Sequence, residues 1–341
     1  MELVIDGFGG DNAPRSVVGG SITAVNLIKD LKITLTGDKD KLQSELDFFG
    51  YKGDKINILH APEVISNNES PTLAIRQKKD SSLVVGLDYA ISKLEDPEFA
   101  GFISGGSTGA VLTGALLKIG RIKGIKRPAL APVFPNLKDG NTLLIDCGAN
   151  MDSKPEFLEQ FALMGSLYMK TMYGIENPRV ALLNVGVEDK KGNELTHSAF
   201  ELLKNNKDIN FVGNMEARDM FSGDFDVVVT DGFAGNVLLK SCEGTALFIL
   251  KSLKKEIKSS GLLTKLGAGL IKKPINRLKK KIDFNAIGGS PFLGVKCPVV
   301  KAHGSSDQVS IFGAINLALK IYKAKFVPEF TQELQNYDLG E

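Results

Sequence analysis

Six short runs of valine, isoleucine and leucine in this sequence end in glycine mixed with polar or charged residues. The six blocks cover residues 5–12, 102–109, 144–150, 183–193, 229–236 and 300–307. Each apolar run is too short for a helix and is typical of a strand buried on both faces. Glycine allows a sharp turn or the close approach of a ligand, and open α/β sheets bind ligands at the carboxyl ends of parallel strands. We therefore expect the six strand ends to share one active site.

The second block joins a predicted strand to a predicted helix through Ser-Gly-Gly-Ser-Thr-Gly-Ala at residues 104–110. Small residues there leave backbone N–H groups free at a helix N-terminus, where anions bind. The loop lacks the Gly-Lys-Ser/Thr of a nucleotide-binding P-loop and is not a GxGxxG motif, so nucleotide binding has little support. An ordinary tight turn is the alternative. The candidate anion-binding residues are Ser104, Gly106, Ser107, Thr108 and Gly109.

Polar residues in and near the other blocks complete the candidate site. Those that we expect to bind phosphate or substrate are Asp6, Gly10, Asp11, Asp146, Lys154, Asn193, Asp231, Gly304, Ser305 and Ser306. Four more are expected to take part in catalysis, namely Lys191, Asn236, His303 and Asn150. A solvated charged loop is the alternative for residues 188–193, and a structural histidine is the alternative for His303.

The sequence offers no convincing nucleophile. Cys147 stands at a strand end in Asp-Cys-Gly, where a small buried apolar residue is the favoured interpretation. Neither a GxSxG elbow nor an HExxH helix is present. The acidic residues are scattered singly, so we expect no obligate metal and no cofactor.

The 341 residues are 43% hydrophobic and are long enough to bury a large core. Strand-like runs alternate with patterns of helical spacing, which predicts a three-layer α/β/α sandwich with a largely parallel sheet. We expect a single α/β domain over residues 1–341, with room for two subdomains. The three cysteines are widely spaced and form no CxxC, and no signal peptide is expected, so the sequence favours a reducing cytoplasm.

Residues 249–285 interrupt this alternation with a basic amphipathic segment. Between residues 251 and 281 the chain has eleven Lys or Arg and one acid, Glu256, which makes this stretch +10 in a chain of net charge +2. Apolar residues at helical spacing face one side of the predicted helices. An arm that binds an anionic membrane surface or an acidic partner is the favoured interpretation. A solvated structural helix is the alternative, and nucleic acid is not expected because no aromatic residues are interleaved.

In fixed order, these blocks closely resemble the PlsX family of bacterial phosphate acyltransferases, from residue 1 to about residue 326. The resemblance is carried by IDGFGGDNAP, SGGSTGA, GRIKGIKRPALAP, DCGANMDSKPEFLEQFALMG, NPRVALLNVGVEDKKGNEL, NFVGNMEARD, VVVTDGFAGNVLLK and KAHGSSD. The family more often has Asp-Ala-Met-Gly-Gly-Asp in the first block and Ser-Ala-Gly-Asn-Thr-Gly-Ala in the second. Here Gly7, Phe8, Gly105 and Ser107 differ, so no side-chain amide is available at position 107.

The resemblance implies a fold like the isocitrate and isopropylmalate dehydrogenases and the phosphotransacetylases. It also implies a homodimer held at the inner face of the cell membrane by the arm at residues 251–281. The implied reaction transfers a long-chain acyl group from acyl carrier protein to inorganic phosphate and gives acyl phosphate for phospholipid synthesis. A short-chain phosphotransacetylase acting on acyl-CoA, a dehydrogenase of the same fold and a non-catalytic membrane scaffold are the alternatives.

The residues suit direct attack by phosphate, which is already a nucleophilic dianion near neutral pH. We expect phosphate among the Ser104–Gly109 backbone, Lys191 and His303–Ser305, with Asn236 or Asn150 donating to the oxyanion. Lys191 matches the lysine of the family's Lys-Gly block and is the first catalytic expectation, with Asn236 second.

Overall fold

The strands of the computed structural model form two sheets, and residues 1–281, 288–335 and 337 are described. The first sheet contains β1 (Glu2–Asp6), β2 (Lys32–Gly37), β3 (Ile56–His60), β4 (Phe99–Ser104), β5 (Ala129–Leu130), β11 (Ser290–Leu293) and β12 (Val299–Lys301). Their order is β3-β2-β1-β4-β12-β11-β5, and only β11 runs antiparallel to its neighbours within the described strands. The predicted strands in this sheet are therefore parallel, as expected.

The second sheet contains β6 (Val133–Pro135), β7 (Asn141–Ile145), β8 (Arg179–Asn184), β9 (Asn210–Glu216) and β10 (Val227–Val229). Its order is β6-β7-β10-β8-β9, with β6 antiparallel to β7 and the other pairs parallel. The central strands consist almost entirely of buried apolar residues because helices cover both of their faces.

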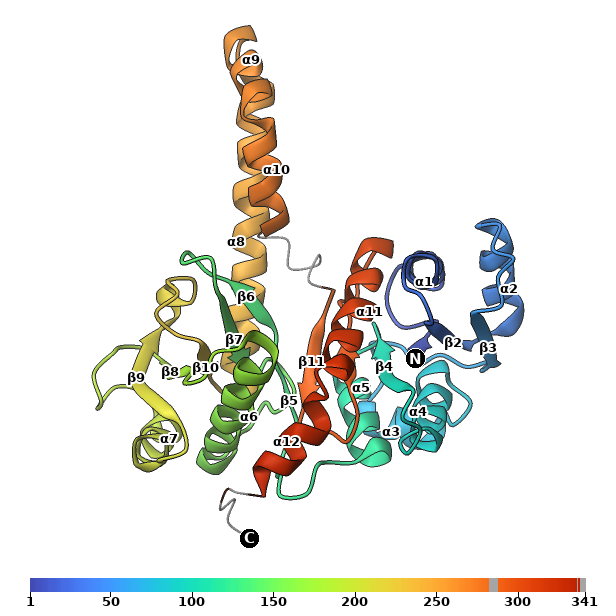
Figure 1. Cartoon of the computed structure of the whole chain (residues 1–341). Helices are drawn as coiled ribbons and strands as arrows, with labels where there is room; N and C mark the ends of the chain where they lie inside the picture. The colour runs from blue at the N-terminus through green and yellow to red at the C-terminus, as the bar shows by residue number, and fades with distance from the viewer. Residues whose placement is uncertain (282–287, 336, 338–341) are drawn as a thin grey trace.

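The helices form the outer two layers around the sheets (Figure 1). One hydrophobic core lies under α1 (Arg15–Leu27), α2 (Lys39–Phe48), α6 (Pro155–Tyr173), α7 (Glu194–Asn205), α11 (Gln308–Lys323) and α12 (Phe326–Leu334). The other lies under α3 (Pro71–Gln77), α4 (Ser82–Ser92), α5 (Thr108–Gly114) and the π-helical turn η1 (Ala115–Ile119). Each core draws residues from strands of both sheets, so the fold is the expected α/β/α arrangement.

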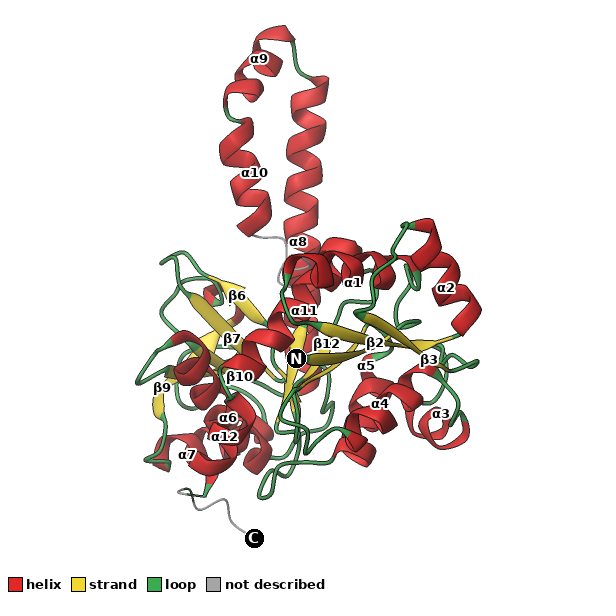
Figure 2. Cartoon of the chain, turned by 45° about the vertical axis from the view of Figure 1, so that its right-hand side comes forward, coloured by secondary structure: helices red, strands yellow, loops and turns green. Residues whose placement is uncertain are grey.

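A long helix, α8 (Gly232–Ser259), leaves the body and forms an arm with α9 (Leu262–Leu270) and α10 (Lys272–Lys281) (Figures 1 and 2). The arm was expected from residue 249, but its helix begins inside the body at Gly232. In the described part of the chain, α8 is the helix that has the length and composition to cross a membrane. Residues 282–285 of the expected arm lie outside the described residues.

The first turn of α8 is fixed against the second sheet. Asp231 caps the helix by accepting hydrogen bonds from the N–H groups of Phe233 and Ala234, both at 2.8 Å. Gly232 N–H donates to the Asn150 carbonyl at 2.8 Å, and a Cβ atom on Gly235 would overlap the Asp146 carbonyl oxygen. The backbone at the start of α8 is therefore fixed to the body, although the Phe233 side chain in this first turn is exposed.

Candidate active site

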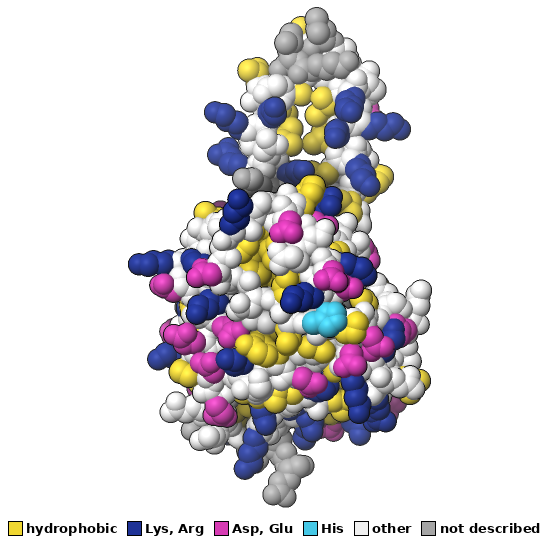
Figure 3. Space-filling model, turned by 90° about the vertical axis from the view of Figure 1, so that its right-hand side faces the viewer, with side chains coloured by type: hydrophobic (Ala, Val, Ile, Leu, Met, Phe, Trp, Pro, Cys, Tyr) yellow, Lys and Arg dark blue, Asp and Glu magenta, His cyan; other side chains and the backbone are white. Residues whose placement is uncertain are grey.

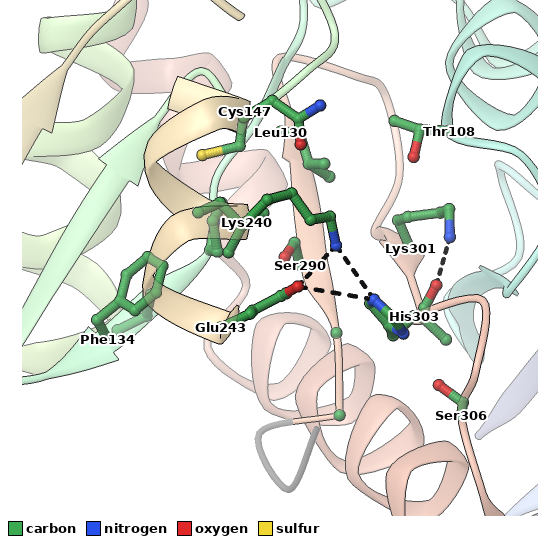
Figure 4. Close-up of a pocket in the computed structure, with 17 residues that line it drawn as sticks. Thr108, Leu130, Phe134, Cys147, Lys240, Glu243, Ser290, Lys301, His303 and Ser306 are labelled. Atoms are coloured by element: carbon green, nitrogen blue, oxygen red, sulfur yellow. Dashed lines mark hydrogen bonds and ion pairs between the residues drawn. The ribbon is translucent and has the colours of Figure 1, made fainter. Parts of the chain in front are cut away.

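A cavity of about 110 Å³ lies where strand ends of the two sheets face each other (Figure 4). From the first sheet it is lined by Thr108, which follows β4, and by residues that end or follow β12. From the second sheet it is lined by Cys147, which follows β7, and by Asn236 on the helix after β10. Four of the six strand-end blocks thus supply lining residues to one cavity.

A network of charged side chains occupies one side of this cavity (Figure 4). The Lys240 ammonium lies 3.2 Å from His303 Nε2 and donates to Glu243 at 2.8 Å. His303 Nδ1 lies 2.8 Å from the Ser305 hydroxyl and accepts a hydrogen bond from the Ser305 N–H at 3.2 Å. Burial and the charge of Lys240 lower the pKa of His303, so the imidazole is neutral near pH 7.

Lys301 is a buried lysine on the same side of the cavity, and the sequence analysis did not select it. Its side chain is 8% exposed, and its ammonium donates to the backbone carbonyls of Gly105, at 3.4 Å, and of Ala302. The charges of Lys240, Asp6 and Asp11 act on it without a direct hydrogen bond among the described residues. Desolvation, followed by the charge of Lys240, lowers the pKa of Lys301 to about 8. Its ammonium can therefore attract an anion. A lysine inside an otherwise apolar strand was the sequence signal that could have identified this residue.

The groups nearest to these cations suit an anion. Thr108 lines the cavity at the start of α5, where the first backbone N–H groups of the helix have no intrahelical acceptor. Ser306 also lines it, and its hydroxyl is buried without a hydrogen-bond partner among the described residues. A buried hydroxyl that lacks a partner is costly unless a ligand or water satisfies it. Two ammonium groups, a hydroxyl and a helix N-terminus therefore converge on this side.

Residues of the first and second blocks mainly hold the loops of the anion site in place and do not themselves line the cavity, apart from Thr108. Ser104 donates to the Asp6 carboxylate at 2.7 Å and accepts from the Gly106 N–H at 3.0 Å, while burial raises the pKa of Asp6. Asp11 N–H donates to the Gly304 carbonyl at 2.7 Å. Gly10 has a φ of 108°, and a Cβ atom there would meet the same carbonyl at 2.8 Å. These contacts fix the β12 loop in place.

Two residues of the third block build a turn rather than the cavity surface. The Asp146 carboxylate accepts hydrogen bonds from the N–H groups of Leu130, Cys147, Ala149 and Asn150. The Asn150 amide donates to the Pro128 carbonyl at 2.9 Å and to Asp146 at 3.0 Å. Both hydrogens of that amide are engaged, so the expected oxyanion donor is better placed at Asn236.

Asn236 lines the cavity from the second turn of α8, close to the Gly148 backbone. Lys240 and Glu243 follow it at helical spacing on the same face, which was the sequence signal for these two missed residues. The other candidates that follow strands of the second sheet cap helices and do not line the cavity. Asp231 caps α8, and Asn193 caps α7 in a box with Thr196.

Lys191 and Lys154 are exposed and do not line the cavity in the described structure. Lys191 lies on the loop after β8, and its backbone carbonyl accepts a hydrogen bond from Asn184. Its expected catalytic role stays a prediction.

The opposite wall of the cavity is apolar. It is formed by Leu130, Pro132, Val133, Phe134, Cys147 and Leu239. The Cys147 thiol is buried, and desolvation, then the charge of Asp146, raises its pKa well above the ordinary value. It therefore behaves as an apolar residue and not as a thiolate nucleophile. The cavity can hold an anion and an apolar group side by side.

Comparison with known proteins fits this arrangement. The sequence profile described as fatty acid synthesis protein matches residues 1–328. A phosphate acyltransferase from Clostridium perfringens (strain SM101 / Type A) is 47% identical over 334 residues, which cover 98% of this chain and 97% of that protein. The chain belongs to the PlsX family. A second PlsX-family relative, the phosphate acyltransferase of Bacillus subtilis (strain 168), is 45% identical over 341 residues, the full length of both chains.

Solved structures support the fold alone. A phosphotransacetylase from Streptococcus pyogenes superimposes with a TM-score of 0.55 at 15% identity, covering 98% of this chain and 94% of that one. The EutD phosphotransacetylase from Staphylococcus aureus gives 0.56 at 14% identity, covering 96% and 94%. The fold expected from the PlsX resemblance is confirmed, and the family membership makes this chain a phosphate acyltransferase.

Proposed function

We propose that the cavity transfers a long-chain fatty acyl group from acyl carrier protein to inorganic phosphate. The observation that carries this proposal is the division of one cavity into a cationic side and an apolar wall. Phosphate would bind at Lys301, Ser306 and the N-terminus of α5, and the first carbons of the acyl chain would lie against Phe134 and Leu239. The reacting carbonyl would then lie between them, within reach of Asn236.

The reaction needs no acyl-enzyme intermediate. An oxygen of the phosphate dianion attacks the thioester carbonyl carbon, forming a C–O bond and a tetrahedral oxyanion to which the Asn236 amide donates. Collapse of the oxyanion breaks the C–S bond. The proton left on phosphate passes through neutral His303 to the departing thiolate, so that acyl phosphate and free carrier thiol are formed. Fixed orientation of the two substrates supplies the rest of the rate enhancement.

Phosphate-dependent release of thiol from palmitoyl-acyl carrier protein, with hydroxylamine trapping of the acyl phosphate, tests this function. Thiol release that requires phosphate and yields hydroxamate is expected. Release without phosphate would indicate a thioesterase, and faster turnover of acetyl-CoA would indicate a short-chain phosphotransacetylase. No release at all would favour a dehydrogenase or a scaffold.

We also propose that the arm binds the anionic inner face of the cell membrane. Leu263 and Leu270 on α9 are 85% and 86% exposed, and the surrounding segment is strongly basic. Lysines at a membrane surface contribute about 1 kcal/mol each, and a buried leucine about 1.5–3 kcal/mol. The same basic surface is complementary to an acidic carrier protein.

Replacing Leu263 and Leu270 by glutamate is expected to weaken binding to anionic liposomes by about 100-fold or more, since two leucines together contribute about 3 kcal/mol. Sedimentation with liposomes measures the bound fraction. Leu27→Glu is the matched control, because Leu27 is also exposed, at 70%, but lies on α1. Equal binding by the double variant and the control would exclude α9 as the anchor.

We propose further that a second copy of the chain packs against α8. Phe233, Val237 and Phe248 lie on one face of this helix and are 65%, 52% and 70% exposed. Exposed apolar patches of this kind mark interaction surfaces. Phe248→Glu is expected to convert a homodimer into a monomer in light scattering, while Leu27→Glu leaves the mass unchanged. A Phe248→Glu dimer would place the interface elsewhere.

A further inference from the structure

One face of α8 continues from the catalytic cavity into the arm. Asn236, Leu239 and Glu243 line the cavity, and Leu247, Leu250, Lys254 and Ile257 line a groove farther along the same helix. These positions are three or four residues apart, so they form one stripe along the helix. The catalytic cavity and the groove therefore occupy successive turns of a single helix face.

The groove lies between α8 and α10 and has a volume of about 450 Å³, which is the size of a small-molecule site. Its apolar lining includes Leu247, Leu250, Leu253, Ile257, Ala268 and Ile275. Lysines stand along its rim, at positions 251, 254, 258, 272 and 279. Figure 3 shows hydrophobic side chains on the inner sides of the arm and basic side chains around them.

The lining of this groove is not closed off as in a packed helical hairpin. Leu247 is 55% exposed and Leu253 is 40% exposed, although both line the space between the two helices. Leaving such side chains in contact with water forfeits much of the stabilisation that burial of a leucine gives. The groove is thus a surface that an apolar ligand would complete.

The dimensions match one fatty acyl chain. Leu247 follows Asn236 by eleven residues, which is about 16 Å along a helix that rises 1.5 Å per residue. The hydrocarbon core of a bilayer is about 30 Å thick and holds two layers of acyl chains, so one long chain spans about 15 Å. A chain with its carbonyl at Asn236 therefore reaches about as far as Leu247, whereas a chain of half that length ends between Lys240 and Glu243, inside the cavity lining.

We propose that the α8–α10 groove holds the distal part of the acyl chain during transfer and conducts the acyl phosphate product from the cavity toward the arm. This inference rests on the acyl transfer proposed above. The apolar wall at Phe134 and Leu239 receives the first carbons, and the end of the groove nearest the cavity, at Leu247, receives the end of the chain. The lysine rim attracts the anionic headgroup of the product as it leaves.

The test compares two chain lengths in variants that fill the groove. Leu247→Trp is expected to lower kcat/KM for palmitoyl-acyl carrier protein at least 10-fold and to leave octanoyl-acyl carrier protein within 2-fold of wild type. Leu250→Trp provides a second variant with the same expectation, because a helical side chain leans toward the helix N-terminus and an indole at position 250 would fill the space beside Leu247. Ser252→Trp is the matched control, because it adds the same side chain to α8 outside the groove. It should leave kcat/KM for both substrates unchanged.

Three results would overturn the proposal. Equal losses with both chain lengths in Leu247→Trp would indicate damage to the cavity, and no loss with either would show that the groove is empty. Loss of palmitoyl turnover in Ile249→Trp alone would move the chain to the separate apolar groove beside Leu137 and Phe221. Failure of the acyl-transfer function itself is distinguishable, because wild type would then release no thiol from either substrate in response to phosphate.

A measurement on the unmodified protein does not depend on the folding of any variant. Palmitoyl-acyl carrier protein with a photoreactive group at the terminal carbon is expected to crosslink to residues of α8 or α10. Crosslinks confined to the body, with none on the arm, would contradict the proposal.

Discussion

Replacing Asn236 by alanine is expected to lower kcat for acyl transfer by about 10²–10³-fold and to change KM little. This range is the usual effect of removing one oxyanion-hole donor, about 2.7–4 kcal/mol of transition-state stabilisation. The loss falls on kcat because the oxyanion exists only in the transition state and the intermediate. Steady-state kinetics with palmitoyl-acyl carrier protein at saturating phosphate measure both constants.

The surroundings of Asn236 make this a test of chemistry and not of folding. Its side chain is partly exposed in the cavity, and α8 is fixed by the Asp231 cap and by Gly235. The melting temperature should therefore change little. Asn150→Ala is the comparison, because it removes two buried hydrogen bonds, to Pro128 and Asp146, and should cost about 1–3 kcal/mol of stability. A normal kcat in Asn236→Ala would remove this residue from the mechanism.

Local sequence patterns predicted most elements of the fold. The bounds of β8 (Arg179–Asn184) and α7 (Glu194–Asn205) agree with runs whose periodicity and flanking residues are unambiguous. The short strands β5, β6 and β11 have two to four residues, and a strand of that length has too few positions to show a period. Their existence depends on pairing with distant strands, which one sequence does not reveal.

The site was predictable to the extent that it depends on strand ends. His303, Ser306, Thr108 and Asn236 were selected because they follow apolar runs, and all four line the cavity. The sequence does not specify how far a loop extends beyond its strand, so it could not show that Lys191, on the long loop after β8, is exposed outside the cavity lining. The sequence also does not show which polar residues of a block line the cavity and which stabilise its turn. Asp6 is the last residue of β1 and Asp146 directly follows β7, but the Asp146 carboxylate is held by the N–H groups of Leu130, Cys147 and Asn150.

Lys301 was missed because its position within an apolar strand looked structural, and its replacement provides the strongest test of the phosphate site. Lys301→Met keeps the length of the side chain and removes the charge. The kcat/KM for phosphate is expected to fall by about 100-fold, since a hydrogen bond to a charged group contributes about 1.5–3 kcal/mol. Lys207→Met, at an exposed position on the body, should have no effect. Lys191→Met tests the sequence-based expectation under the same conditions.

The dependence of kcat/KM on pH distinguishes the effect of the Lys301 charge on phosphate binding from the effect of its side-chain shape. Burial lowers the pKa of Lys301 from 10.5 to about 8, so the ammonium is present below that pH and is lost above it. Because kcat/KM reports the ionisation of the free enzyme, its value for phosphate should fall in wild type as the pH rises through about 8. Lys301→Met has no proton to lose at this position, so its kcat/KM for phosphate should not fall as the pH rises through about 8. The same fall above pH 8 in Lys301→Met would assign the ionisation to another group and leave Lys301 without its proposed role in binding phosphate.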